Sequence, residues 1–441
     1  MADDKVKVDA IVVGGGPAGL AAAYTMAKQG LEVILIERGE YAGSKNLGGL
    51  LYGTILNEMI PKFWESAPIE RSVVKRQVVY LGIDHHMGMS FGSRRWGKPP
   101  YNLTCTVHRS QFDRWFAKQA EAVGASLLEG MVVEHLLYEG EGPAKKAVGA
   151  KLRTGEDFFA DVVVLCDGAH SLVTQQTLAD LGMAGGREPQ DYALGVKETI
   201  RLDPKTIEAR FGLDPGEGCA FDYLGEPFAG LVGGGFIYTQ KEDVSIGLVA
   251  KLETIAKRGQ TPNELLDGFK RHPEVRRLLQ GGELLEYGAH LIPEGGYQAV
   301  PQLAANGVMI AGDAAGLVNV SLYKEGTNHA MESGKYAGET VVEAKKGGDF
   351  SRAGLAGYER KMKDSIALQD LKKYEDLPDI LANVPEVLST YPDRVNQLMV
   401  DYFTVSAEPK KTIQKRAIKA FFKDLSKFKL ACDLLRARKL M

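Results

Sequence analysis

Short, uniformly apolar runs alternate with segments of helical periodicity over the first 190 residues, a pattern typical of a parallel sheet covered by helices. Residues 9–13 predict a buried strand, residues 20–29 predict a helix that stops at Gly30, and residues 31–36 predict a second strand. A further helix is expected to begin near Arg109, and further strands are expected at 125–128, 132–133, 147–150 and 162–165.

The pattern changes at about residue 192 and stays different to about residue 297. Its short, turn-bounded strands predict an antiparallel sheet, with strands at 195–200, 235–239 and 244–249 and a short helix at 263–271. The apolar run at 307–313 returns to the first pattern. A helix is then expected at 326–344, and the chain from about residue 350 on is largely helical in periodicity.

Two glycine-rich loops lie about three hundred residues apart. The first, Gly14-x-Gly16-x-x-Gly19, stands between a predicted strand and a predicted helix and contains Pro17 and Ala18. Glu37 follows 23 residues after Gly14, at the end of the next strand, where a ribose-binding acid is expected. The second loop is Gly312-Asp313-Ala-Ala-Gly316. Together the loops predict FAD bound by a discontinuous Rossmann domain.

The expected organisation follows from these loops. We expect the FAD-binding domain at 1–190 and 301–347, an inserted antiparallel-sheet substrate domain at 191–300, and a helical region with a basic amphipathic tail at 348–441.

Composition excludes several alternatives. The four cysteines are far apart, which argues against a local redox pair or an iron–sulfur site and favours a reducing compartment. No metal site is expected, because His85 and His86 lack further ligands nearby. The uncharged stretch 10–27 contains Gly and Pro and has no basic segment before it, so neither a signal peptide nor a transmembrane helix is expected.

Charge is concentrated at the C-terminus, although the whole chain carries only −3. Residues 410–441 contain eleven Lys or Arg and two Asp, and apolar residues recur there at helical spacing: Ile418, Phe421, Leu425, Phe428, Cys432 and Leu435. Two interpretations stay open: a helix packed on its own domain, or a helix that docks on a partner or an anionic membrane surface. Nucleic acid is not expected as a partner.

Several longer stretches carry a family resemblance. They are Gly43-Ser44-Lys45-Asn46-Leu-Gly-Gly49, Gly233-Gly234-Gly235-Phe-Ile-Tyr238, Tyr287-Gly-Ala289 followed by Pro293-Glu-Gly-Gly-Tyr297 with Pro301, and Glu325-Gly326-Thr327-Asn328-His329-Ala-Met331. Over about residues 8–405 the chain resembles the electron-transfer-flavoprotein:quinone oxidoreductase family, in particular its FixC-like branch. The resemblance implies a glutathione-reductase-like fold and, as cofactor, FAD.

The resemblance also implies roles for individual residues. Gly14, Gly16 and Gly19 would hold the pyrophosphate, Glu37 the adenosine ribose, Arg109 the phosphates and Asp313 the ribityl chain. Quinone contacts are expected at Gly234, Gly235 and His329. The remaining FAD candidates are Pro17, Ala18, Arg38, Ser44, Lys45, Asn46, Val133, Asp167, Gly168, Gly312, Gly326, Thr327 and Asn328. No side chain is expected to act as a catalyst, since the flavin carries the redox step.

The activity implied is electron transfer from reduced electron-transfer flavoprotein, with both of its subunits, to a membrane quinone, either menaquinone or ubiquinone. Longer family members carry a four-iron, four-sulfur domain. This chain has no cysteine quartet, so a separate ferredoxin-like iron–sulfur protein is the expected partner. The implied location is peripheral, on the cytoplasmic side of the membrane.

Three questions of function stay open in the sequence. Electron bifurcation by the complex is neither required nor excluded. A geranylgeranyl-reductase-like flavoenzyme that reduces isoprenoid double bonds shares the Gly312–Gly316 loop. A structural FAD-bearing subunit that assembles partners is a third hypothesis.

Overall fold

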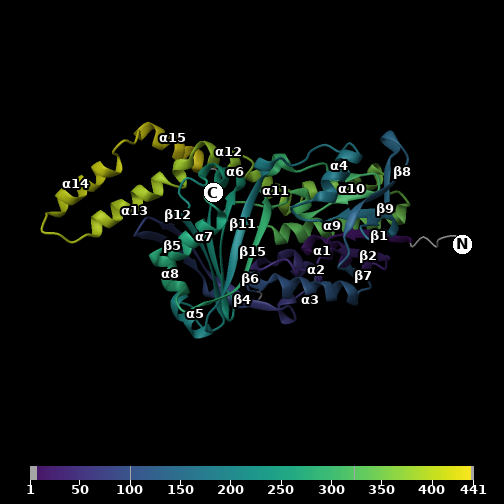
Figure 1. Cartoon of the computed structure of the whole chain (residues 1–441), viewed down its shortest axis with the longest axis horizontal. Helices are drawn as coiled ribbons and strands as arrows, with labels where there is room; N and C mark the ends of the chain where they lie inside the picture. Colours follow the sequence, from purple (N-terminus) through teal and green to yellow (C-terminus); the bar gives the residue numbers. More distant parts are fainter. Residues whose placement is uncertain (1–6, 100, 322, 439–441) are drawn as a thin grey trace. The chain divides into compact units, whose positions relative to one another are not determined.

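The computed structural model describes residues 7–99, 101–321 and 323–438 and divides into two compact units. Unit 1 comprises the chain up to Glu70, Leu103–Tyr192 and Leu291–Glu375. Unit 2 comprises Arg71–Asn102, Ala193–His290 and the chain from Asp376 on. Each unit is therefore assembled from segments that are far apart in the sequence (Figure 1).

Unit 1 is built on a mainly parallel sheet with the strand order β16-β17-β10-β1-β2-β7. The β17, β10, β1, β2 and β7 strands are parallel, β16 is antiparallel to β17, and β8 and β9 form a hairpin on β10. The bounds are β1 (Lys7–Val13), β2 (Val33–Glu37), β7 (Ser126–Glu129), β8 (Val133–Glu139), β9 (Lys146–Leu152), β10 (Asp157–Leu165), β16 (Ala304–Ala305) and β17 (Val308–Ile310). This arrangement confirms the predicted α/β architecture with a mainly parallel sheet.

Two long helices of unit 1 pack closely on each other. Along α1 (Pro17–Ala27) nearly every residue is buried, which explains its uncharged sequence. A Cβ atom at Gly334 of α9 (Thr327–Gly347) would lie 2.0 Å from the Ala18 carbonyl oxygen, so the helix contact requires glycine there. This helix was predicted at 326–344. In the structure it begins at Thr327, with Gly326 as its N-cap residue, and ends at Gly347.

The other elements of unit 1 surround this core. They are β3 (Gly48–Tyr52), which is antiparallel to β6 (Thr104–His108), and the helices α2 (Thr54–Met59), α3 (Arg109–Ala122), α4 (Leu172–Asp180), α10 (Arg352–Lys363) and α11 (Ile366–Lys373).

Unit 2 contains the predicted antiparallel sheet, in the order β15-β11-β14-β13-β12, but the sheet continues into β4 and β5. The bounds are β4 (Ile69–Leu81), β5 (His86–Gly92), β11 (Tyr192–Arg201), β12 (Glu217–Gly225), β13 (Gly233–Thr239), β14 (Asp243–Lys251) and β15 (Glu283–Pro293). Since β4 is parallel to β12, the sheet is mixed, which corrects the expectation of a purely antiparallel one.

Helices α5 (Pro204–Phe211), α6 (Leu252–Arg258), α7 (Pro262–Arg271) and α8 (Pro273–Leu279) complete this part of unit 2. At the start of α7, Thr261 and Glu264 form a capping box, and Phe269 packs its ring 5.0 Å from that of Tyr223. The ring contact joins α7 to β12 within the hydrophobic core of the unit.

The compact units differ from the four-part division expected from the sequence. Residues 71–102 group with residues 193–290, because β4 forms a parallel ladder with β12 that runs from Ser72 to Leu81. Residues 348–375 group with the FAD-binding segments, while the chain from Asp376 on belongs to unit 2.

The C-terminal region is helical as predicted, but its tail is not one amphipathic helix. The chain forms α12 (Leu377–Asn383), α13 (Thr390–Phe403), α14 (Lys410–Phe421) and α15 (Lys427–Ala437), and α13 and α14 lie side by side (Figure 1). Asp424 interrupts the helix with a positive φ of 59°. Ile418, Phe428 and Leu435 of the predicted apolar stripe are exposed, whereas α14 buries Ile413 and Ala417.

No helix within residues 7–99, 101–321 and 323–438 combines the length and apolar character needed to cross a bilayer.

Candidate functional site

The first glycine loop of unit 1 forms a cradle at the N-terminus of α1. Gly14 and Gly19 are required by the fold, because a Cβ atom would lie 2.2 Å from the Cys166 carbonyl oxygen at Gly14 and 1.9 Å from the Gly14 carbonyl oxygen at Gly19. Gly16 differs, since a Cβ atom there would have no described atom within 4 Å. Open space at Gly16 beside a helix N-terminus is suited to a phosphate.

The start of α1 provides the donors that such a phosphate needs. Pro17 occupies the first turn, and Gly16 caps the helix without a side-chain hydrogen bond from any described residue. No acidic residue stands in the first turn. The free N–H groups and the positive end of the helix dipole therefore face the open space, and the cradle fits the pyrophosphate of FAD.

Glu37 ends β2 beside this cradle, as predicted. Its carboxylate accepts hydrogen bonds from the backbone N–H groups of Gly15 (2.7 Å) and Gly39 (2.5 Å). Those bonds fix the carboxylate at the end of the strand, where a ribose hydroxyl is expected. The neighbouring Arg38 is exposed.

Arg109 begins α3 and is held by a buried acid that the sequence analysis did not single out. Its guanidinium donates two hydrogen bonds to Asp113, of 2.8 and 2.7 Å. Burial raises the pKa of Asp113, and the Asp113 carboxylate raises the pKa of Arg109 despite the opposing effect of burial. Gly43 packs against this pair, because a Cβ atom there would lie only 2.6 Å from the Arg109 carbonyl oxygen. This close contact holds the turn Ser44–Asn46 beside α3.

The second glycine loop contacts the first. Gly312 has a φ of +67°, and a Cβ atom there would lie 2.7 Å from Cβ of Ala18. Its N–H group donates to the Ser333 hydroxyl at 2.9 Å. Asp313 is thereby held close to the start of α1, and burial raises the pKa of its carboxyl group.

Arg187 is a residue of this site that the sequence reasoning missed. Its guanidinium donates to the carbonyl oxygens of Asp313 (2.8 Å) and Ala314 (3.1 Å) and to the Ser171 hydroxyl (2.5 Å). The side chain thus holds the Asp313 loop against the segment that follows β10. No local motif marks Arg187, because the loop that it holds, Asp313 and Ala314, lies more than a hundred residues away in sequence.

Asp167 and Asn328 have structural partners in the described chain. Asp167 accepts hydrogen bonds from the N–H groups of Val173 (3.0 Å) and Thr174 (3.2 Å) at the start of α4. Asn328 accepts one from the N–H group of Ile55 in α2, at 3.0 Å. Contacts of these residues with FAD stay predictions, as do those of Gly168 with its positive φ, Val133 in β8, Lys45 and Thr327.

The predicted quinone residues lie in different units. Gly235 on β13 pairs with Tyr223 of β12 and Leu248 of β14, so ladder bonds use its backbone, and a Cβ atom would lie 2.8 Å from the rings of Phe228 and Phe269. Gly234 pairs with Val249. Packing therefore accounts for both glycines. His329 lies on the first turn of α9 in unit 1 and is buried.

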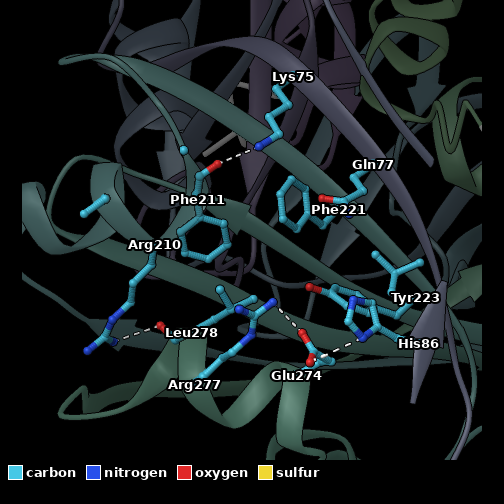
Figure 2. Close-up of a pocket in the computed structure, with 13 residues that line it drawn as sticks. Lys75, Gln77, His86, Arg210, Phe211, Phe221, Tyr223, Glu274, Arg277 and Leu278 are labelled. Carbon is cyan, nitrogen blue, oxygen red and sulfur yellow. Dashed lines mark hydrogen bonds and ion pairs between the residues drawn. The ribbon is translucent and has the colours of Figure 1, made fainter. Parts of the chain in front are cut away.

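A separate cavity of about 280 Å³ lies in unit 2, between the sheet and helices α5 and α8 (Figure 2). Its lining includes the rings of Phe211 and Phe221. Lys75 and Arg210 each donate a hydrogen bond to a backbone carbonyl oxygen. Glu274 contacts His86 at 3.3 Å and forms an ion pair with Arg277, as Figure 2 shows. The cavity includes none of the predicted FAD or quinone residues among the described residues that line it.

Comparison with solved structures supports the fold. The chain is similar to a geranylgeranyl bacteriochlorophyll reductase-like protein from Thermoplasma acidophilum, with a TM-score of 0.73 and 22% identity, covering 99% of this chain and 100% of that one. At this identity the similarity concerns the fold alone.

Family models match three segments. An FAD binding domain matches residues 7–197, an ETF-QO ubiquinone-binding model matches residues 192–292, and an ETF-QO/FixC family C-terminal domain matches residues 377–441. The first match contains the glycine cradle, which confirms FAD as the cofactor.

Relatives align over nearly the entire chain. A probable electron transfer flavoprotein-quinone oxidoreductase, YdiS, from Escherichia coli (strain K12) is 41% identical over 94% of each chain. Protein FixC from Azotobacter vinelandii is 40% identical over 98% of each chain. The chain therefore belongs to the electron-transfer-flavoprotein:quinone oxidoreductase/FixC family of flavin-dependent oxidoreductases.

Proposed function

We propose that this chain accepts electrons from a reduced electron-transfer flavoprotein and passes them to a membrane quinone through its bound FAD. The observation that carries the proposal is the alignment of about 40% identity with such relatives over the whole chain, including a ubiquinone-binding model over residues 192–292. FAD supplies the redox chemistry when bound, and the chain positions and buries it.

The residues of unit 1 support this function without a catalytic side chain. The open space at Gly16 receives the pyrophosphate, Glu37 orients the adenosine ribose, and Asp313 faces the ribityl chain. Asp113 holds Arg109 in one orientation, so the guanidinium can meet a phosphate with little loss of side-chain entropy.

The partners of the proposed complex are those that the resemblance to the FixC-like branch implies. A separate ferredoxin-like protein supplies the iron–sulfur cluster, since the four cysteines of this chain are widely spaced and free. If the complex bifurcates electrons, the bifurcating flavin belongs to the electron-transfer flavoprotein. The basic C-terminal helices favour peripheral association with the cytoplasmic face of the membrane.

Anaerobic mixing tests the choice of electron donor. The FAD-loaded protein is mixed with reduced electron-transfer flavoprotein, with NADH or with NADPH, and the flavin absorbance is followed. We expect bleaching by the flavoprotein alone, reversed by a quinone analogue. Rapid bleaching by a nicotinamide without flavoprotein would contradict the proposal and indicate a stand-alone reductase or monooxygenase.

A geranylgeranyl-reductase-like activity is the second candidate, because a solved structure of that description shares the fold over the whole chain. Reduction of a prenyl double bond by the isolated chain would establish it. A purely structural role predicts that the complex turns over equally fast when this chain lacks FAD. Gly16→Glu is suited to that test, because its Cβ atom meets no described atom within 4 Å, while its carboxylate would fill the open space and repel the pyrophosphate.

A further inference from the structure

Three titratable side chains of unit 1 converge beside the start of α9. Glu325 precedes the helix, His329 lies on its first turn, and Asp370 lies on α11, which packs against α9. One nitrogen or oxygen atom from each side chain lies within 4.8 Å of the others. Neither Glu325 nor Asp370 is among the residues that are proposed to bind FAD.

The three side chains form a series from the surface to the interior. Asp370 is half-buried, the side chain of Glu325 is 11% exposed, and that of His329 is 0% exposed. Nε2 of His329 lies 3.6 Å from Oε2 of Glu325. A shift of roughly 0.7 Å would bring these atoms to hydrogen-bond distance.

The ring nitrogens of His329 are both buried, and neither makes a hydrogen bond of normal geometry to a described residue. The backbone of Leu317 lies close enough to raise the pKa of the ring, but this effect is smaller than that of burial. Burial lowers the pKa of His329 to about 4, so at neutral pH the ring is neutral, with one nitrogen that accepts and one that donates. It directly follows Gly326, Thr327 and Asn328, which are the expected flavin contacts.

We propose that Asp370, Glu325 and His329 form a path that carries protons from solvent to the cofactor site at the start of α9. The proposal rests on the proposed function, in which a quinone takes up two electrons and two protons to become a quinol. The reduced electron-transfer flavoprotein supplies the electrons, and solvent supplies the protons.

Each transfer along the path breaks one bond to hydrogen and forms another. Asp370 takes a proton from water and passes it to the Glu325 carboxylate. The Glu325 carboxyl group protonates Nε2 of His329, and Nδ1 releases its proton to the acceptor at the cofactor site. Burial raises the pKa of both Glu325 and Asp370, which brings their protonation closer to neutral pH.

Two further charged groups, Glu332 and Lys373, act on the members of this path. Glu332 of α9, which raises the pKa of Glu325 by repulsion, accepts hydrogen bonds from the N–H groups of Ile366 (3.0 Å) and Ala367 (2.9 Å) at the start of α11. Lys373 of α11 lowers the pKa of Asp370 by attraction. Glu332 is therefore a buried acid with a structural role and provides a matched control.

The test compares Glu325→Gln with Glu332→Gln in the FAD-loaded protein. In Glu325→Gln we expect reoxidation of the flavin by a quinone analogue to slow by roughly 100-fold, with a weaker pH dependence and a changed solvent isotope effect. The midpoint potential of the flavin should stay within experimental error of that of the wild type. Glu332→Gln should lower the unfolding temperature and change the reoxidation rate far less than Glu325→Gln does, because it removes only one repulsive contribution to the pKa of Glu325 and no group of the path. Asp370→Asn, on the half-buried side chain, provides a second variant that should slow the reaction less.

Infrared difference spectra recorded on flavin reduction supply a readout that does not depend on turnover. The wild type should show a carbonyl band of a protonated carboxylic acid, and Glu325→Gln should lose it. If the wild type cycles but both Glu325→Gln and Asp370→Asn match it in rate and isotope effect, the path is wrong. If EDTA removes a stoichiometric metal and abolishes the wild-type rate, the cluster is a metal site. If the wild type itself does not cycle, the proposed function fails.

Discussion

At the residue scale, substitutions at two glycines of the cradle should have different effects, one on the stability of the fold and the other on the affinity for FAD. In Gly19→Ala the methyl group would lie 1.9 Å from the Gly14 carbonyl oxygen, so we expect the flavin-free protein to lose about 2 kcal/mol or more in its free energy of unfolding. In Gly16→Ala the loss should be under about 1 kcal/mol, because no described atom is within 4 Å. The FAD affinity of Gly16→Ala should nevertheless fall about tenfold, equivalent to about 1.4 kcal/mol.

Urea unfolding of the flavin-free variants and titration with FAD measure the two effects separately. Equal FAD affinity in Gly16→Ala and the wild type would show that the open space at Gly16 does not receive the pyrophosphate. Equal stability of Gly19→Ala and the wild type would show that the loop can move away from the added methyl group.

Local motifs identify some residues of the site but not the side chains that hold them. Gly14, Gly16, Gly19 and Glu37 follow from spacing alone, because strand, turn, helix and acid occur within one continuous segment. Arg187 could not be found this way, since its acceptors at Asp313 and Ala314 lie more than a hundred residues away. Such partners are determined by tertiary structure, which periodicity does not report.

At the element scale, α14 packs against α13 and buries two of its apolar residues, Ile413 and Ala417. Ile413 is 2% exposed, whereas Ile418 on the same helix is 53% exposed. We expect Ile413→Ala to destabilise the α13–α14 pair by about 2–4 kcal/mol and Ile418→Ala to change it by less than about 0.5 kcal/mol. Hydrogen exchange of the α13 and α14 amides measures the local stability. Equal exchange in the two variants would mean that Ile413 does not join the helices.

In the tail, the periodicity of apolar residues did not predict the break between α14 and α15. Residues Ile418, Phe421, Leu425 and Phe428 follow helical spacing, which predicted one continuous apolar face. Asp424 interrupts the helix with its positive φ, so the residues on either side of it no longer share a face. A single residue in the left-handed region leaves the apolar spacing unchanged, and the pattern therefore did not reveal the break.

At the scale of the whole molecule, sequence order and spatial grouping differ. The parallel sheet, the antiparallel strands 195–249 and the helical C-terminus were all predicted, because each depends on local periodicity. The pairing of β4 with β12 was not predicted, since it joins strands more than a hundred residues apart and follows no short motif. It is this pairing that places residues 71–102 in unit 2.

The division into units leads to a prediction for the basic tail. Deletion of residues 410–441 removes eleven Lys or Arg and two Asp, so the net charge changes from −3 to −12, but it removes no residue of unit 1. We therefore expect the ratio of FAD to protein, measured by absorbance, to stay the same. Binding to vesicles containing phosphatidylglycerol should fall more than tenfold, because each Lys or Arg near an anionic surface contributes about 1 kcal/mol and the deletion removes several such residues.

Replacement of Lys410, Lys411 and Lys415 by Gln provides the control, because it removes charge and keeps both helices of the α13–α14 pair. This variant should bind vesicles more weakly than the wild type, and added salt should reduce the difference. Unchanged vesicle binding in both variants would exclude the tail as a membrane contact and favour a protein partner. Loss of FAD on deletion would instead mean that the tail stabilises the flavin-binding unit itself, the alternative that the amphipathic pattern left open.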